Sequence, residues 1–200
     1  MLEAADLACE RGGRVLFRNL SLALSGGDLL RIAGPNGAGK TSLLRILCGL
    51  LSPTGGEVRW KGSAIGSLKE EYARELVYLG HAPAVKDELT AAENLAIACG
   101  LAGVPVSQES ISDALGRFGV PDGPLLKRLS QGQRRRAALA RLALSAAVPL
   151  WLLDEPLTAL DAAAAASLEM LLTQHVGRGG AVVFTSHQDV RLQHTRMIEL

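Results

Sequence analysis

One segment restricts the possible folds of this 200-residue chain more than any other, and it reads Gly34-Pro35-Asn36-Gly37-Ala38-Gly39-Lys40-Thr41. It follows the apolar stretch Leu29–Ala33, an expected strand, and precedes an expected helix through Leu50. In this order glycines let backbone N–H groups close around phosphate oxygens, and the positive end of the helix dipole faces the same anion. The pattern predicts Lys40 on the β- and γ-phosphates of a nucleotide, Thr41 on Mg²⁺ and Ser42 as a further phosphate contact. The structural alternative is a glycine-rich turn that happens to precede a lysine. We call residues 34–41 the phosphate loop.

Composition predicts one globular domain. The chain is 48% hydrophobic, and 21 Lys+Arg against 20 Asp+Glu give a formal charge of +1, which excludes disordered and strongly basic classes. Its apolar runs, such as Pro149–Leu153, are shorter than the roughly 20 residues of a membrane-spanning helix. The first residues, MLEAADLACE, lack the basic start and apolar stretch of a secretory signal, so we expect an intracellular protein.

Strand and helix patterns alternate along the chain, which predicts an α/β fold with helices covering a sheet. The expected strands are Leu2–Cys9, Leu29–Ala33, Glu57–Trp60, Leu76–Leu79, Pro149–Leu153, Ala181–Phe184 and Arg196–Leu200. One expected helix begins at Thr90 with Glu93 completing a capping box, another runs from Ser130 to about Ala146, and a third is capped by Asp161. Helix-rich residues, about 84–145, are expected to form a helical subdomain inserted into a core of about 1–83 and 146–200.

A second chemical motif follows the apolar strand Pro149–Leu153, which ends in Asp154 and Glu155. A hard cation such as Mg²⁺ prefers oxygen ligands, so Asp154 is a candidate for the metal, and Glu155 is the candidate base for an attacking water. Alone, an apolar strand followed by two acids is usually only the end of a strand. Its occurrence together with the phosphate loop favours the chemical interpretation.

A cluster of six positive charges without an acid lies at Lys127, Arg128, Arg134, Arg135, Arg136 and Arg141. No aromatic residues for base stacking are interleaved with it, so a nucleic-acid site is not expected. We interpret the cluster as a solvated helix face near polyphosphate.

Leu129-Ser130-Gln131-Gly132-Gln133 resembles the LSGGQ signature of ATP-binding-cassette (ABC) ATPases, with Gln131 as the one departure. The resemblance implies a P-loop NTPase fold with a mixed or parallel sheet, which binds ATP and Mg²⁺. It also implies a head-to-tail dimer in which Ser130, Gly132 and Gln133 of one chain complete the nucleotide site of the other. Ala159-Leu160-Asp161 resembles the family's D-loop, and His187 resembles the switch histidine that reaches the γ-phosphate.

Two residues depart from the family pattern. His81 stands where the family usually carries a glutamine, and Arg11 stands near the position of the aromatic that stacks on adenine. Imidazole is a poor Mg²⁺ ligand, so we expect His81 to orient water or relay motion. A guanidinium can stack on a base, so we expect Arg11 to contact adenine.

Within the family, the segments GHAPAVKDELTAAENL and LSQGQRRRAALARL resemble the ATP-binding subunits of the bacterial cytochrome c maturation (haem exporter) complex. This resemblance implies a peripheral ATPase on the cytoplasmic face of the inner membrane, docked on CcmB-like and CcmC-like membrane subunits. Its hydrolysis would drive haem export and release of the haem-loaded chaperone. The chain has no C-x-x-C-H, so no direct haem binding is expected.

Three other classes stay open from the sequence. The first is a cassette that serves another exporter with unknown cargo. The second is a cassette acting on nucleic acid or ribosomes, although such proteins need paired cassettes or a long insert. The third is a nucleotide-binding regulator without turnover, which His81 and Arg11 would allow.

Overall fold

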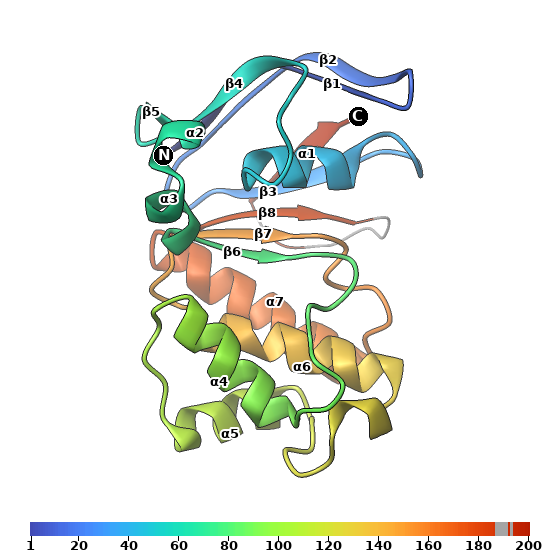
Figure 1. Ribbon diagram of the computed structural model, residues 1–200, viewed down its shortest axis with the longest axis vertical. Coiled ribbons are helices and arrows are strands. Elements are labelled where there is room, and N and C mark those ends of the chain that lie inside the picture. The colour runs from blue at the N-terminus through green and yellow to red at the C-terminus, as the bar shows by residue number, and fades with distance from the viewer. Residues whose placement is uncertain (187–191, 193) are drawn as a thin grey trace. The chain divides into compact units, whose positions relative to one another are not determined.

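The computed structural model describes residues 1–186, 192 and 194–200 (Figure 1). Its residue contacts divide the chain into two compact units, each formed from separate stretches of sequence. Unit 1 consists of Met1–Tyr78, Val148–Glu155 and His175–Leu200, and unit 2 consists of Leu79–Ala147 and Pro156–Gln174. Among the described residues, no helix is long and apolar enough to cross a membrane.

A five-stranded sheet carries the phosphate loop. Its strands are β6 (Leu76–Leu79), β7 (Leu150–Leu153), β8 (Ala181–Thr185), β3 (Leu29–Ala33) and β9 (Thr195–Glu199), side by side in that order. The pairs β7·β8, β8·β3 and β3·β9 are parallel. Every residue of β7 and β8 is buried, as expected for parallel strands covered on both faces. The segments that follow β3, β7 and β8 therefore all begin at the same end of the sheet, at the carboxyl ends of these strands.

The second sheet of unit 1 is antiparallel and has the order β2-β1-β4-β5. These strands are β1 (Leu2–Arg11), β2 (Arg14–Leu24), β4 (Gly55–Trp60) and β5 (Ser63–Ala64). The sequence prediction missed β2 and β5, whereas its other seven strands are confirmed within two residues at each end. β2 pairs with β1 across a tight turn at Gly12 and Gly13, both at positive φ, which is typical of a hairpin.

Helix α1 (Lys40–Leu47) lies between the two sheets (Figure 1). Its apolar side chains belong to a core that includes residues of strands from both sheets. Leu43, Leu44, Ile46 and Leu47 are fully buried there. The helix ends earlier than the predicted Leu50, because Gly49 adopts a positive φ of 78° and the N–H groups of Leu50 and Leu51 return to the carbonyl of Arg45. Two short helices, α2 (Ile65–Leu68) and α3 (Glu70–Arg74), follow the antiparallel sheet.

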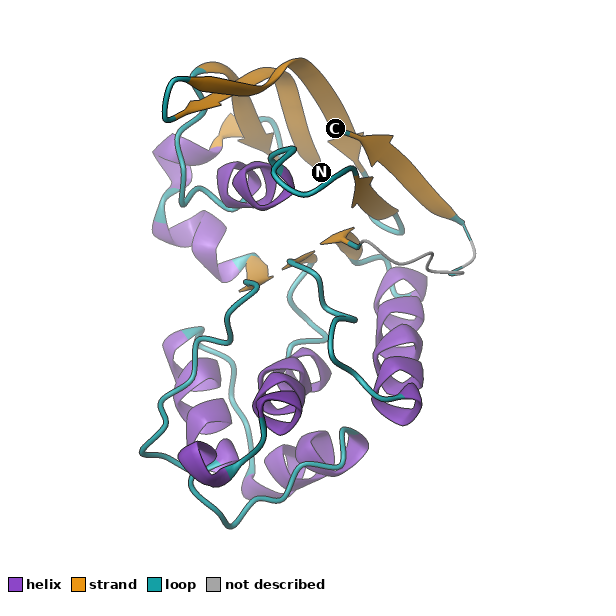
Figure 2. Ribbon diagram, turned by 90° about the vertical axis from the view of Figure 1, so that its right-hand side faces the viewer, coloured by secondary structure: helices purple, strands orange, loops and turns teal. Residues whose placement is uncertain are grey.

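Helices make up most of unit 2 (Figure 2, purple). They are α4 (Ala91–Leu101), α5 (Gln108–Arg117), the 3₁₀ turn η1 (Leu126–Arg128), α6 (Gln131–Leu144) and most of α7 (Ala162–Gly177). Helices α4, α5 and α6 pack on one another through buried residues that include Leu95, Ile111 and Leu139. The capping box of Thr90 and Glu93 is confirmed, and so is Asp161 as the cap of α7, since its Oδ1 accepts the N–H of Ala164 at 2.8 Å.

Candidate functional site

The phosphate loop joins β3 to the first residue of α1, as its sequence predicts. Gly34, Gly37 and Gly39 have φ values of 138°, 80° and 111°, which are accessible to glycine and strained for other residues. A Cβ at Gly34 would lie 2.7 Å from the carbonyl oxygen of Leu200, so this backbone also passes too close to its neighbour for a side chain. α1 begins without a side-chain cap, and its first N–H groups are donors suited to an anion.

Lys40 lies inside the loop and is 7% exposed. Its Nζ donates to the carbonyl oxygens of Gly34 at 2.8 Å and Pro35 at 2.9 Å. These carbonyls hold a buried ammonium group where the loop would enclose a phosphate, and a buried charge requires such partners. Pro35, Asn36 and Ala38 form the bend of the loop, and Ser42 lies on the first turn of α1.

The two predicted metal residues are in direct contact. Thr41 Oγ1 donates to Asp154 Oδ2 at 2.8 Å, although 113 positions separate the two residues in the sequence. Asp154 is 1% exposed and follows β7, two strands away from β3 in the sheet. A hydroxyl and a carboxylate at this distance are the hard oxygen donors that Mg²⁺ prefers, so the residues fit such an ion.

Thr185, which the sequence interpretation did not single out, completes this cluster. It ends β8 and is fully buried, with its Oγ1 donating to Asp154 Oδ1 at 2.8 Å and accepting the N–H of Glu155 at 2.8 Å. One hydroxyl thus orients both acids. The available signal was a polar residue at the end of an otherwise apolar strand, Ala181–Phe184, that neighbours the strand before Asp154.

Glu155 has a φ of 50°, which is unusual for a residue with a Cβ and costs about 1–3 kcal/mol. The hydrogen bond from its N–H to Thr185 holds this conformation. Such strain persists where the surrounding structure fixes it, and here it turns the chain sharply after β7.

The signature segment lies in unit 2 at the start of α6. Ser130 is the N-cap: its Oγ accepts the N–H of Gln133 at 3.2 Å, and Gln133 Oε1 accepts the N–H of Ser130 at 2.9 Å. A Cβ added at Gly132 would lie 3.5 Å from the carbonyl oxygen of Ala159. The helix predicted to run to about Ala146 ends at Leu144.

Two arginines of α6 contradict the predicted solvated face. Arg135 is 7% exposed, and its Nη1 donates to the carbonyls of Gly80 and His81. Arg136 Nη1 pairs with Asp161 Oδ2 at 2.5 Å. Both side chains bind other segments of unit 2 instead of facing only solvent, because α6 is packed on several sides.

The remaining predicted residues are distributed between the units. Arg11 is exposed at the end of β1, next to the hairpin turn, and the same hairpin packs on the phosphate loop through Leu16 and Phe17, whose atoms lie 3.1–3.3 Å from a Cβ position at Gly39. His81 follows β6 in unit 2. His187 lies outside the described residues.

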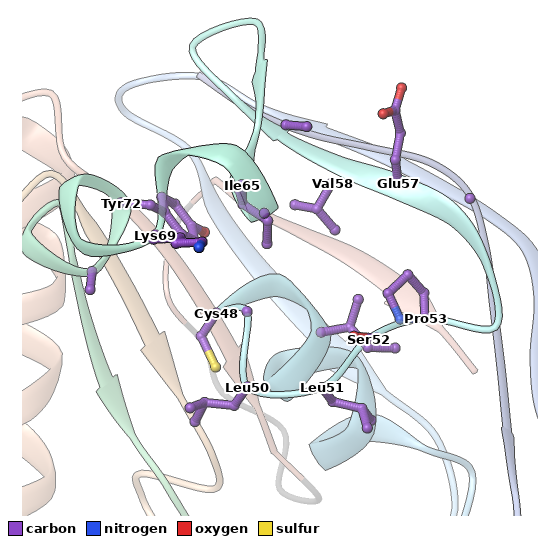
Figure 3. Close-up of a pocket in the computed structure, with 16 residues that line it drawn as sticks. Cys48, Leu50, Leu51, Ser52, Pro53, Glu57, Val58, Ile65, Lys69 and Tyr72 are labelled. Atoms are coloured by element: carbon purple, nitrogen blue, oxygen red, sulfur yellow. The ribbon is translucent and has the colours of Figure 1, made fainter.

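A separate hollow of about 540 Å³ lies in unit 1 beyond the C-terminus of α1. Figure 3 shows Cys48 and Leu51 on one side of it, with Val58 and Ile65 opposite. Burial raises the pKa of the Cys48 thiol, which lowers the fraction of reactive thiolate. The hollow contains none of the phosphate-loop residues.

The fold and the geometry of the phosphate loop are those expected of a nucleotide-binding cassette. The chain belongs to the ABC transporter family, whose model matches residues 17–158, and it is an ATPase of that family. It is similar to the cytochrome c biogenesis ATP-binding export protein CcmA of Aromatoleum aromaticum, with 57% identity covering 94% of this chain and 89% of that protein. CcmA of Nitrosospira multiformis is 50% identical, covering 96% of this chain and 93% of that protein.

Solved structures support the same fold. A putative ABC transporter ATP-binding protein from Pyrococcus furiosus has a TM-score of 0.84 at 25% identity, covering 100% of this chain and 96% of that one. A dimeric post-hydrolysis structure of the ATP-binding cassette MJ0796, bound to ADP and Pi, has a TM-score of 0.86 at 24% identity, covering 100% of this chain and 94% of that one. At this identity the MJ0796 structure establishes the fold alone.

Proposed function

We propose that this chain is the ATP-hydrolysing subunit of a membrane ABC complex for cytochrome c maturation, coupling hydrolysis to haem export and release of the haem-loaded chaperone. The observation that carries the ATPase chemistry is the cluster in which Thr41 and Thr185 both donate to Asp154, while Thr185 also holds Glu155. The process is supported by the near full-length similarity to CcmA proteins, at 45–57% identity in five of them.

ATP binding starts at the phosphate loop. The N–H groups at the start of α1 and the ammonium of Lys40 receive the triphosphate, and Lys40 exchanges its carbonyl partners at Gly34 and Pro35 for phosphate oxygens. Gly37, Ala38 and Gly39 bring the backbone close, with Asn36 and Ser42 at the rim. Arg11, on the hairpin that packs against the loop, stacks on the adenine.

Thr41 and Asp154 would hold Mg²⁺, which would neutralise charge on the phosphate oxygens. Glu155 accepts a proton from the attacking water, since a carboxylate held in a fixed direction is suited to general base catalysis. His187 orients that water at the γ-phosphate. Fixed positions and charges supply most of the acceleration in phosphoryl transfer, so the rigid backbone at Glu155 is part of the mechanism.

A second copy of the chain contributes the residues that cover the other side of the bound nucleotide. In a head-to-tail pair, Ser130, Gly132 and Gln133 of one copy face the triphosphate on the other, where the start of α6 provides N–H donors and helix dipole for an anion. Asp161 lies beside this contact, and the dimeric MJ0796 cassette has a similar fold. Residues 84–145 act as the helical subdomain, and His81 relays closure.

The chain acts from the cytoplasmic face of the bacterial inner membrane, as a peripheral subunit on CcmB-like and CcmC-like partners. It binds ATP and Mg²⁺ but neither haem nor nucleic acid. The partners bind the cargo, and the cassette supplies the conformational cycle that releases it.

Gene deletion with complementation tests this function. In the deletion strain, staining for covalently bound haem should show loss of c-type cytochromes, and the wild-type gene should restore them. Glu155→Gln should not restore them, since it loses the base: kcat should fall about 10²–10⁴-fold while ATP binding is retained. Normal cytochrome levels in the deletion strain contradict the assigned process, and full ATPase activity of Glu155→Gln contradicts the assigned base.

A further inference from the structure

Arg135 is a buried cation that donates hydrogen bonds to two backbone carbonyls. Its Nη1 lies 2.9 Å from the carbonyl oxygen of Gly80 and 2.8 Å from that of His81, and the residue is 7% exposed. A guanidinium remains charged when buried, so it requires acceptors, and these two carbonyls belong to the segment directly after β6. Loss of this side chain would leave two carbonyls without their charged donor.

The far end of the same segment is held as well. Lys86 is paired with the Asn94 amide of α4, which accepts the Lys86 N–H at 2.7 Å and donates to the Lys86 carbonyl at 3.0 Å. Asp87 forms an ion pair with Arg134 of α6 at 3.1 Å. We call residues 80–87 the His81 loop. One end is held by Arg135 of α6, and the other end by Asn94 of α4 and by Arg134, the neighbour of Arg135 on α6.

The same helix begins with the signature segment. Ser130 caps α6, and Arg135 lies only five positions further along. Because a helix is stiff over such a short distance, a displacement of its first turn is transmitted to whatever Arg135 holds.

We propose that Arg135 is a positioning residue that makes the His81 loop move as one piece with the signature segment when the nucleotide site closes. The proposal rests on the function proposed above, in which Ser130 of one copy meets the nucleotide of the other. Arg135 touches no nucleotide in this account: it acts by fixing the backbone that carries His81.

A double-mutant cycle on the purified chain tests the coupling, with kcat for ATP hydrolysis and Kd for MgATP as readouts. We expect Arg135→Gln to lower kcat about tenfold and to change Kd less than about twofold, since the phosphate loop is in unit 1. In a His81→Ala background the same substitution should cost less than about twofold, because residues acting through one another are not additive. Equal losses in both backgrounds, or no loss at all, overturn the proposal.

Arg117→Gln is the matched control. Arg117 is exposed on α5, no described residue pairs with its side chain, and this variant should retain wild-type kcat. Arg135→Lys keeps the positive charge with a single ammonium donor group, and its kcat should lie between those of the wild type and Arg135→Gln. If Arg135→Gln does not fold, Arg135→Lys serves in the cycle with the same criterion of additivity.

Hydrogen exchange separates this proposal from the proposed function, since it needs no turnover. Arg135→Gln should accelerate exchange of the amides of the His81 loop at least about tenfold and leave the phosphate loop unchanged. Unchanged exchange in the His81 loop refutes the role of Arg135, whatever the ATPase activity. If the wild-type chain does not hydrolyse ATP but exchange is faster in Arg135→Gln, the proposed function is refuted. The positioning role of Arg135 is then still supported.

Discussion

Thr185→Val tests whether one hydroxyl orients the two acids after β7, Asp154 and Glu155. Valine has nearly the same shape, so the change removes the hydrogen bonds to Asp154 and Glu155 without opening a cavity. A hydrogen bond to a charged group contributes about 1.5–3 kcal/mol and a neutral one about 0.5–1.5 kcal/mol, so the free energy of unfolding should fall by about 2–4 kcal/mol. In a chain of this length each kcal/mol lowers Tm by about 2–4 °C.

Activity should fall further than stability alone explains. Without the bond to Thr185 the strained φ of Glu155 is no longer held, so its carboxylate loses its direction and kcat should fall at least about tenfold. Calorimetry and steady-state ATPase assays measure the two effects. Thr185→Ser keeps the hydroxyl and should recover most of both, whereas Thr173→Val, on the exposed side of α7, should change neither. Wild-type Tm and kcat in Thr185→Val would refute the reasoning.

Three further outcomes are expected. Lys40→Ala should weaken MgATP binding at least about a hundredfold by calorimetric titration, because it removes the buried ammonium that we propose contacts the phosphates; unchanged Kd contradicts the loop's role. Arg136→Ala removes the cation that is paired with Asp161. Because Asp161 is half exposed, the free energy of unfolding should fall by less than about 1 kcal/mol, while kcat should fall several-fold. An unaltered kcat argues against a role of Arg136 in positioning Asp161. Hydrogen bonds from the backbone and side chain of Thr90 lower the pKa of Glu93 below its ordinary 4.5, so their stabilisation is present above that value and is lost as pH falls through the lowered pKa. Melting curves of wild type and Glu93→Gln should therefore converge in acid, and a constant difference would contradict this.

The sequence predicts the phosphate loop and the parallel strands well, because their signals are local. Gly34, Gly37 and Gly39 are required by backbone angles within a few residues, and β7 is apolar throughout. Thr41 and Asp154 are 113 positions apart, so no local pattern predicts their contact. It could be expected only because the sequence assigns both residues to the same Mg²⁺ ion.

The missed features depend on tertiary packing. β2 alternates irregularly and contains Arg14, Arg18 and Asn19, and it is recognisable as a strand mainly by its pairing with β1. The basic run around Arg135 predicts a surface charge. The side chain is instead buried and donates to the carbonyl of His81, 54 positions earlier in the sequence. Thr185 acquires its role only because β8 lies beside β7.

The most direct test of the account is a crystal structure of the Glu155→Gln chain grown with ATP and Mg²⁺, since the substitution should trap the closed pair. We expect two copies related head to tail, with the triphosphate inside residues 34–41 of one copy and Ser130 of the other in contact with the γ-phosphate. A nucleotide bound elsewhere, or a phosphate loop whose bound nucleotide no second copy covers, would contradict the central claim.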